Sequence, residues 1–369
     1  MKASLFCTTR YDGPASHAVW PAPGDTYSAE WAERSMQRTL KQFELGDQLG
    51  FDWVTTAEHH FAPFSMTPNP MVMAAALTNV VKTAKIAVLG PDIPITDPVR
   101  VAEEMAMVDT MTGGRVIAGL MRGSANEYVT YNVNPAESRE RFEEALQVIR
   151  TCWTETEPFG WQGRFYQYRT ISIWPRPVQQ PLPPIYISGS SRDSGEWAAK
   201  NRVGLGLAFT NLPLAAEAAR FYRERCAAYG WEPAPDQIVY QLPIFVGETD
   251  KDADEAVRPS IERHGLGFAM VKANRLSAEA GFFGARDAKL TTRFRDLNQD
   301  APKSLEGAIE MGTVICGGPK SVIAQVKRLR DEIGCGVLNL IFDRAGPVEA
   351  KRRSLELFAK EVMPEVRAL

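Results

Sequence analysis

The chain has few cysteines, few histidines and no marked excess of charge of either sign. Its five cysteines are scattered, odd in number and never spaced as Cys-x-x-Cys: Cys7, Cys152, Cys226, Cys316 and Cys335. This pattern excludes a secreted disulfide framework and predicts a reducing, cytoplasmic setting. The 42 Lys and Arg against 45 Asp and Glu give a net charge of −3, which argues against nucleic acid or an anionic membrane as a partner.

Long hydrophobic runs are also missing from the 369 residues. The apolar segments are strand-sized and interrupted by charges, so we expect no transmembrane span. Residues 1–14 have too short an apolar run for a signal peptide and lack a small-residue cleavage pattern. The hydrophobic content of 44% is typical of an ordinary globular protein.

Short β-branched runs alternate with segments of helical period along the whole chain. The expected strands are residues 2–8, 51–56, 85–90, 115–120, 185–189, 204–209, 238–246 and 336–342. Two irregular stretches interrupt this alternation. Residues 158–184 are rich in proline and aromatic side chains and are expected to hold a short hairpin, and residues of about 262–305 are typical of a mobile lid or a disordered loop. No linker divides the chain, so we predict a single domain over residues 1–369.

Strands that alternate with helices fit either a (β/α)8 TIM barrel or a doubly wound sheet. The doubly wound fold calls for a glycine-rich phosphate turn after the first strand, and residues 9–14 (Thr-Arg-Tyr-Asp-Gly-Pro) do not form one. We therefore predict an α/β fold of the TIM-barrel type with insertions. Its active site would be built from loops at the carboxyl ends of the strands.

The chain has only four histidines, and two of them, His59 and His60, are adjacent at the end of the second expected strand. Consecutive strand residues point to opposite sides, so one imidazole can face the pocket while the other supports it. Acid–base chemistry and a purely structural role for either histidine are equally compatible with this position. A metal site is disfavoured because Glu58-His59-His60 lacks helical ligand spacing.

Two strand ends carry groups suited to a phosphate. Arg122 precedes a glycine after the fourth strand, and Ser190 and Ser191 follow Gly189 where a helix is expected to begin. Arginine, hydroxyls and the first amides of a helix bind phosphate oxygens. Each feature alone is typical of a surface ion pair or an ordinary helix cap, but together on neighbouring strands they predict a phosphorylated ligand.

Two other enzyme classes are less favoured. Glu58 and Glu127 could serve as the carboxylate pair of a glycoside hydrolase, although the predicted phosphate site would then have no use. A serine nucleophile is disfavoured because no Gly-x-Ser-x-Gly elbow occurs.

Several motifs resemble, in order and spacing, the bacterial luciferase-like flavin-dependent monooxygenases. They are Glu58–Phe61, Asn69-Pro70, Asp97–Glu104, Gly114–Gly123, Pro183–Ser191 and Gly317-Gly318-Pro319. The similarity extends along nearly the whole chain, and the first 200 residues are especially similar to the luciferase catalytic subunit.

The resemblance implies a TIM barrel whose mobile loop, at roughly residues 275–305, closes over the site. It implies reduced FMN as cofactor, supplied by a separate NAD(P)H:flavin reductase. O2 adds at flavin C4a, and the resulting peroxide transfers one oxygen atom to a small organic substrate. A homodimer is the expected assembly.

The resemblance also assigns roles to individual residues. His59 takes the catalytic position beside the flavin, as a general base or as a group that steadies the peroxide, and His60 supports it. The flavin phosphate contacts are Arg122, Ser190, Ser191 and Ser194, and the positions around the flavin include Glu58, Leu89, Gly90 and Met121. A non-prolyl cis peptide between Leu89 and Gly90 is expected beneath the isoalloxazine ring.

The chain also departs from luciferase. Met121 stands in place of a reactive cysteine, Ser190 in place of a glutamate, and the long-chain aldehyde pocket is not recognisable, so we expect no light emission. Hydride transfer with the deazaflavin F420, or a non-catalytic flavin-binding subunit, are the alternatives. The substrate and the type of oxygenation stay open.

Overall fold

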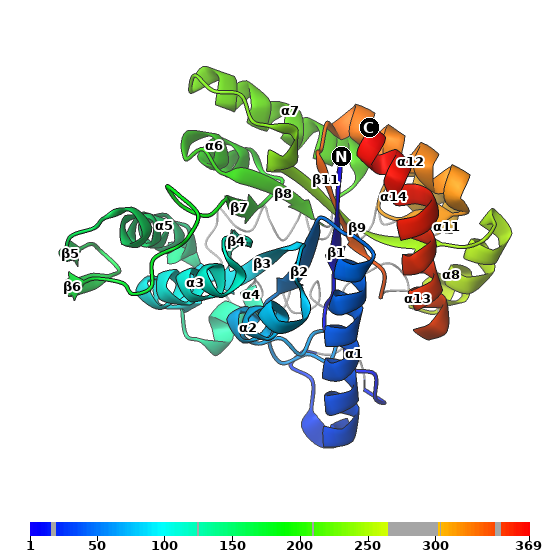
Figure 1. Cartoon of the computed structure of the whole chain (residues 1–369), viewed down its shortest axis with the longest axis horizontal. Helices are drawn as coiled ribbons and strands as arrows, with labels where there is room; N and C mark the ends of the chain where they lie inside the picture. The colour runs from blue at the N-terminus through cyan, green and yellow to red at the C-terminus, as the bar shows by residue number, and fades with distance from the viewer. Residues whose placement is uncertain (16–19, 124, 209, 265–301, 303, 344–347) are drawn as a thin grey trace.

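Parallel strands close into a barrel that is surrounded by helices (Figure 1). The computed structural model describes residues 1–15, 20–123, 125–208, 210–264, 302, 304–343 and 348–369. The eight barrel strands, in order around the ring, are β1 (Lys2–Phe6), β2 (Trp53–Ala57), β3 (Lys85–Asp92), β4 (Val116–Met121), β7 (Ile185–Ser188), β8 (Gly204–Ala208), β9 (Ile238–Val246) and β11 (Val337–Ile341). Pairing of β9 with β8 and of β11 with β1 closes the ring, which confirms the predicted TIM barrel.

Helices follow the strands along the chain. Their bounds are α1 (Ala29–Gln48), α2 (Pro70–Val80), α3 (Pro98–Thr112), α4 (Ala125–Thr130), α5 (Ser138–Thr154), α6 (Arg192–Lys200), α7 (Leu212–Ala228), α8 (Asp250–His264), α11 (Leu305–Glu310), α12 (Pro319–Ile333), α13 (Val348–Leu357) and α14 (Met363–Ala368). Shorter 3-10 turns span Gly24–Thr26, Ile93–Ile95, Pro135–Glu137 and Pro235–Gln237, and a π turn spans Phe358–Val362. In the described part of the chain, no helix is both long and apolar enough to cross a bilayer.

Local capping explains where several helices begin and end. The side chain of Asn69 accepts hydrogen bonds from the first amides of α2, and Asp97 does the same for α3. A proline follows each cap, at the first helical position, where its missing N–H costs nothing. Gly113 ends α3 in the left-handed conformation, with φ of 67°.

The barrel interior is layered along its axis. A lower layer packs Trp53, Tyr186 and other apolar residues. Above it, Ser4 Oγ lies 2.7 Å from Thr55 Oγ1 and donates to Asn339 Oδ1 at 2.8 Å, a fully buried polar layer. One step further toward the carboxyl ends, an apolar cluster closes the barrel beneath its mouth: Phe6, Ala57 and Ile341. The mouth therefore has an apolar floor.

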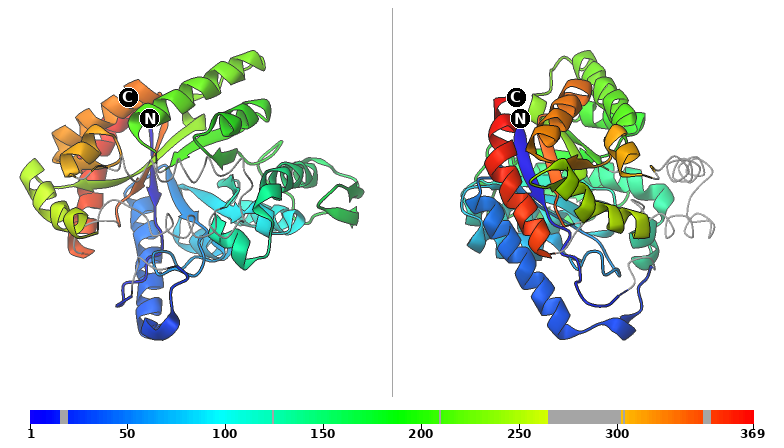
Figure 2. Two further views of the ribbon diagram at one scale, coloured as in Figure 1. Left: turned by 180° about the vertical axis from the view of Figure 1, so that it is seen from behind. Right: turned by 90° about the vertical axis from the view of Figure 1, so that its right-hand side faces the viewer.

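The first of the two irregular stretches contains the expected hairpin. Within residues 158–184, β5 (Phe159–Gln162) and β6 (Gln167–Ile171) form an antiparallel hairpin at the outer edge of the molecule, beyond α3 and α5 (Figures 1 and 2). The expected lid at about 262–305 lies almost entirely outside the described residues. β10 (Ile315–Gly317), which pairs outside the ring with β9, is not among the predicted strands.

Candidate functional site

The two adjacent histidines at the end of β2 occupy different environments. His59 keeps 26% of its side chain exposed and packs its ring 5.0 Å from that of Phe64. His60 is buried, with Nε2 at 2.8 Å from Glu58 Oε1 and Nδ1 at 3.2 Å from the Tyr131 hydroxyl. The difference in burial agrees with the alternation expected along a strand. His59 is therefore the imidazole available to a ligand, and His60 is held inside the wall.

Three carboxylic acids are buried around these histidines. Glu58 accepts a hydrogen bond from the Asp92 backbone N–H at 3.1 Å, and Glu127 Oε1 lies 3.8 Å from Nδ1 of His59. Burial, and then the negative charges of Glu127 and Glu58, raise the pKa of Asp92 well above its usual range. Burial and the nearby negative charges therefore disfavour the ionised form of Asp92.

The carboxylates also act on Tyr131, which follows α4. Burial and the charges of Glu58, Glu127 and Asp92 raise the pKa of the Tyr131 hydroxyl, so that it stays protonated. When His60 donates its Nε2 proton to Glu58, its Nδ1 is left to accept the Tyr131 proton. This chain of contacts connects the loop after β2 with the loop after β4.

A narrow hollow lies where β4 and β7 end and α6 begins. Arg122 and Ser194 line it, as do Ser188 and Arg139. Ser191 caps α6 by accepting from Ser194 N–H at 3.2 Å, and the two serine hydroxyls lie 2.9 Å apart. Two guanidinium groups and two serine hydroxyls thus line this hollow together with the Glu143 carboxylate, and these guanidinium and hydroxyl donors suit a phosphate.

The structure refines the predicted phosphate contacts. Arg122 and Ser194 line the hollow, whereas Ser191 contacts Ser194, and Ser190 is half-buried in the loop beside them. Gly189 is required here because a Cβ would lie 2.5 Å from Ser194 Oγ.

The predicted cis peptide between Leu89 and Gly90 is wrong. In the described ranges, every cis bond precedes a proline: Trp20–Pro21, Trp174–Pro175 and Gln180–Pro181. Gly90 instead has φ of 135°, and a Cβ there would lie 2.9 Å from the Glu58 backbone nitrogen. Glycine therefore serves the close approach of β3 to the end of β2, with no need for a cis bond.

Leu89 and Met121 end the apolar parts of β3 and β4 near the mouth, and both are half-buried. Four residues of the site had no role in the prediction: Asp92, Tyr131, Arg139 and Ser188. Ser188 directly precedes the Gly-Ser-Ser run and could have been included with it. Tertiary packing brings Arg139 and Tyr131 to the site, and no local sequence motif predicts their positions.

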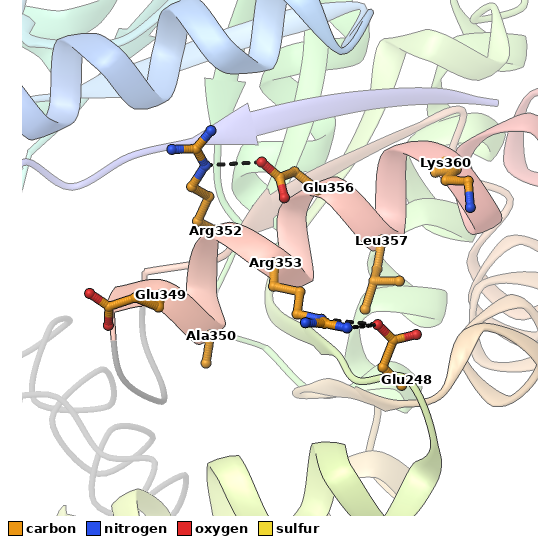
Figure 3. A pocket seen from close by; sticks show the side chains of 8 residues that line it. All are labelled: Glu248, Glu349, Ala350, Arg352, Arg353, Glu356, Leu357 and Lys360. Carbon is orange, nitrogen blue, oxygen red and sulfur yellow. Dashed lines mark hydrogen bonds and ion pairs between the residues drawn. The ribbon is translucent and has the colours of Figure 1, made fainter.

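A larger hollow, of about 520 Å³, lies along α13 beside the loop that follows β9 (Figure 3). Its arginines are paired within the lining, Arg353 with Glu248 and Arg352 with Glu356. The charges there neutralise one another, so this hollow offers no unpaired arginine to an anion. Among the described residues, no group of three or more His, Cys, Asp and Glu side chains is arranged to hold a metal ion.

The geometry of the site agrees with a comparison against protein families. The model of one family, described as luciferase-like monooxygenase, matches residues 1–335. The chain belongs to the luciferase-like monooxygenases. One relative in this family is the oxygenase component of a flavin-dependent trigonelline monooxygenase from Acinetobacter baylyi. It is 26% identical over 355 residues, which cover 89% of this chain and 92% of the relative.

Solved structures share the luciferase-like fold. The oxygenating constituent of 3,6-diketocamphane monooxygenase from Pseudomonas putida, in complex with FMN, superposes with a TM-score of 0.74 at 19% identity, covering 99% of this chain and 98% of that one. An F420-dependent secondary alcohol dehydrogenase in complex with an F420-acetone adduct superposes with a TM-score of 0.71 at 17% identity and covers 99% of both chains. At these identities the likeness concerns the fold.

Proposed function

We propose that this protein is the oxygenase component of a two-component monooxygenase, which uses reduced FMN and O2 to insert one oxygen atom into a small organic substrate. The observation that carries the proposal is the donor set of Arg122, Arg139 and Ser194 at the same barrel mouth as the accessible His59. The relative from Acinetobacter baylyi, named as the oxygenase component of a flavin-dependent monooxygenase, supports the general kind of enzyme.

The residues present fit FMN in three respects. Arg122, Arg139 and Ser194 would hold its phosphate at the end of β7. The apolar floor, together with half-buried Leu89 and Met121, would accept a flat aromatic ring system at the mouth. When bound, the reduced flavin supplies the electrons that activate O2.

His59 is the group of this chain that can move a proton at the mouth. It is the more exposed of the two imidazoles, and a histidine can act as a base near neutral pH. The buried floor beneath it excludes water from one side, which protects a reactive oxygen species from hydrolysis.

Cofactor titration separates FMN from F420. We expect the protein, under anaerobic conditions, to bind reduced FMN more tightly than reduced F420, and we expect oxygen mixed into the FMN complex to reoxidise the flavin more slowly than it does free flavin. Stopped-flow absorbance measures the second step. Tighter binding of F420 without any effect of oxygen would instead favour hydride transfer, and binding without any turnover would favour a non-catalytic subunit.

The same titration tests the phosphate site. Arg122→Gln should weaken binding of FMN by roughly 10- to 100-fold, because a charge-assisted hydrogen bond contributes about 1.5–3 kcal/mol. Arg100→Gln is the matched control, since Arg100 pairs with Glu104 on the exposed face of α3. Riboflavin, which lacks the phosphate, should bind both variants equally. Equal loss of affinity for riboflavin and FMN would place Arg122 outside the phosphate site.

We also propose that the protein works in the cytoplasm with a separate flavin reductase. The five cysteines are free and buried, as in proteins of reducing compartments. The related enzyme from Acinetobacter baylyi is named as an oxygenase component, which supports a partner that reduces the flavin. Reduced FMN can reach the barrel mouth by diffusion.

We also propose that the protein forms a homodimer and that the outer face of α3 is the dimer interface. Met107 and Met111 are exposed one turn apart, and exposed Trp174 and Val178 belong to the segment that packs along α3. An exposed apolar face of this kind commonly marks a protein interface. Met111→Glu should therefore lower the mass seen by sedimentation equilibrium, whereas Tyr229→Glu, at the end of α7, should leave it unchanged. A monomeric wild-type protein would contradict the assignment.

A further inference from the structure

His59 has a buried ring nitrogen with no hydrogen-bond partner. Its Nδ1 is shielded from solvent, and Oε1 of Glu127, a residue without exposed surface, lies 3.8 Å away. That separation is longer than a hydrogen bond. In enzymes without their ligands, catalytic hydrogen bonds are often long and shorten when the site fills.

We propose that Glu127 is the positioning residue of His59: it accepts the Nδ1 proton and thereby leaves Nε2 free to take a proton at the barrel mouth. The inference rests on the proposed function, since it assigns His59 the role of a base. During turnover the proton received at Nε2 would make the imidazole cationic, and the Glu127 carboxylate would stabilise that cation. Release of the same proton to water restores the neutral ring, so the cycle is balanced.

The two other buried carboxylic acids of this cluster, Asp92 and Glu58, differ from Glu127 in their surroundings. Burial and the charges of Glu127 and Glu58 raise the pKa of Asp92 well above its usual range, which disfavours its ionised form. Glu58 is occupied by Nε2 of His60 and by the backbone N–H of Asp92. Within the described part of the chain, Glu127 is the carboxylate that lies within 4 Å of the His59 ring.

The backbone around Glu127 is anchored to both parts of the site. Glu127 lies in α4, where the neighbouring Tyr128 hydroxyl donates to the carbonyl oxygen of Arg122. Tyr131, one turn further, contacts His60. The segment that carries the proposed phosphate ligand Arg122 therefore also carries the carboxylate that orients His59.

The tautomer of His59 tests the proposal without cofactor or substrate. Nitrogen and carbon NMR shifts of an imidazole report which nitrogen carries the proton, and the chain has only four histidines to assign. We expect neutral His59 to carry its proton on Nδ1 in the wild type. In Glu127→Gln, and in Glu127→Met where the acceptor is removed altogether, the proton should move to Nε2. His59→Asn assigns the signal.

Turnover gives a second, independent measurement. Glu127→Gln should lower kcat roughly 10- to 100-fold, as loss of a partner that orients a functional histidine does elsewhere, with FMN affinity little changed. The loss should vanish when the substitution is made in a His59→Asn protein, because the carboxylate acts through that ring. Glu137→Gln, which alters a carboxylate paired with Arg141, is the control.

Two results would overturn the assignment. One is a His59 ring that carries its Nε2 proton in the wild type, and the other is a loss of kcat that stays equally large in the His59→Asn background. Failure of the proposed function looks different, since the wild-type protein would then not use reduced FMN and oxygen at all. Unfolding curves in urea show whether a variant has kept its fold.

Discussion

His59→Ala should reduce coupled oxygenation by roughly 10²- to 10⁴-fold, the usual contribution of a positioned acid or base, while FMN still binds. O2 consumed by the variant should appear instead as hydrogen peroxide. The expectation follows from the position of the residue. His59 lies at the end of β2, half-exposed at the barrel mouth, whereas the proposed phosphate ligands lie across the mouth at β4 and β7.

The reason for separate effects on binding and turnover is spatial. Arg122, Arg139 and Ser194 line a hollow that His59 does not line. Removal of the imidazole therefore leaves the phosphate contacts intact. The variant lacks a group that can accept or donate a proton next to the reacting atoms. Reduced flavin should therefore still be oxidised, but the O2 consumed should be released as hydrogen peroxide and not inserted into the substrate.

The measurement compares hydrogen peroxide released with reduced FMN oxidised, for any substrate that the wild-type protein oxygenates. Phe64→Leu is the matched control, because it changes the ring packed against His59 without removing a titratable group. Coupled turnover in His59→Ala equal to that of the wild type would remove the residue from the mechanism.

Local patterns in the sequence were sufficient to predict the framework of this site. Asn69 and Asp97 cap their helices with their own side chains, and β2 is a run of five buried residues. Such features act between near neighbours in the chain, so they can be recognised without a structure. The carboxyl ends of the strands of a barrel meet at one mouth. The order of the predicted strands therefore also placed His59 and Arg122 at that mouth.

Contacts between distant segments could not be predicted in this way. Nothing near Glu127 in the sequence signals that it faces His59, 68 residues earlier, or that Arg139 lies beside Ser194. The error at Leu89-Gly90 has the same origin. The resemblance supplied a cis bond, whereas the need at this point is the close approach of Gly90 to Glu58, which a glycine with a positive φ meets in the trans form.

Asp92→Asn should make the protein more stable than the wild type, by a margin that grows as the pH rises. Burial, and then the charges of Glu127 and Glu58, raise the pKa of Asp92 well above its usual value of 3.8. At pH values between 3.8, the pKa in the unfolded chain, and the raised pKa in the folded protein, the folded protein holds a proton that the unfolded chain has released. The free energy of unfolding therefore falls by about 1.4 kcal/mol for each pH unit in that window. Asparagine does not titrate, so the variant lacks this slope, and it also removes a charge that would otherwise repel Glu58 and Glu127 at higher pH.

Urea unfolding from about pH 5 to about pH 8 measures the difference in stability. Asp47→Asn is a control in which the change in stability has the opposite sign. Burial raises the pKa of Asp47, but hydrogen bonds to its carboxylate lower that pKa overall. The donors are the backbone N–H groups of Ala84, Lys82 and Thr83 and the Thr83 hydroxyl. Its stabilising effect is complete above the usual carboxyl pKa and is lost only as the pH falls below it. Asp47→Asn should therefore be less stable than the wild type by a constant margin over the same range. Parallel curves for Asp92→Asn and the wild type would show that Asp92 is already ionised in the folded protein, and that the charge of the cluster is shared differently around His59.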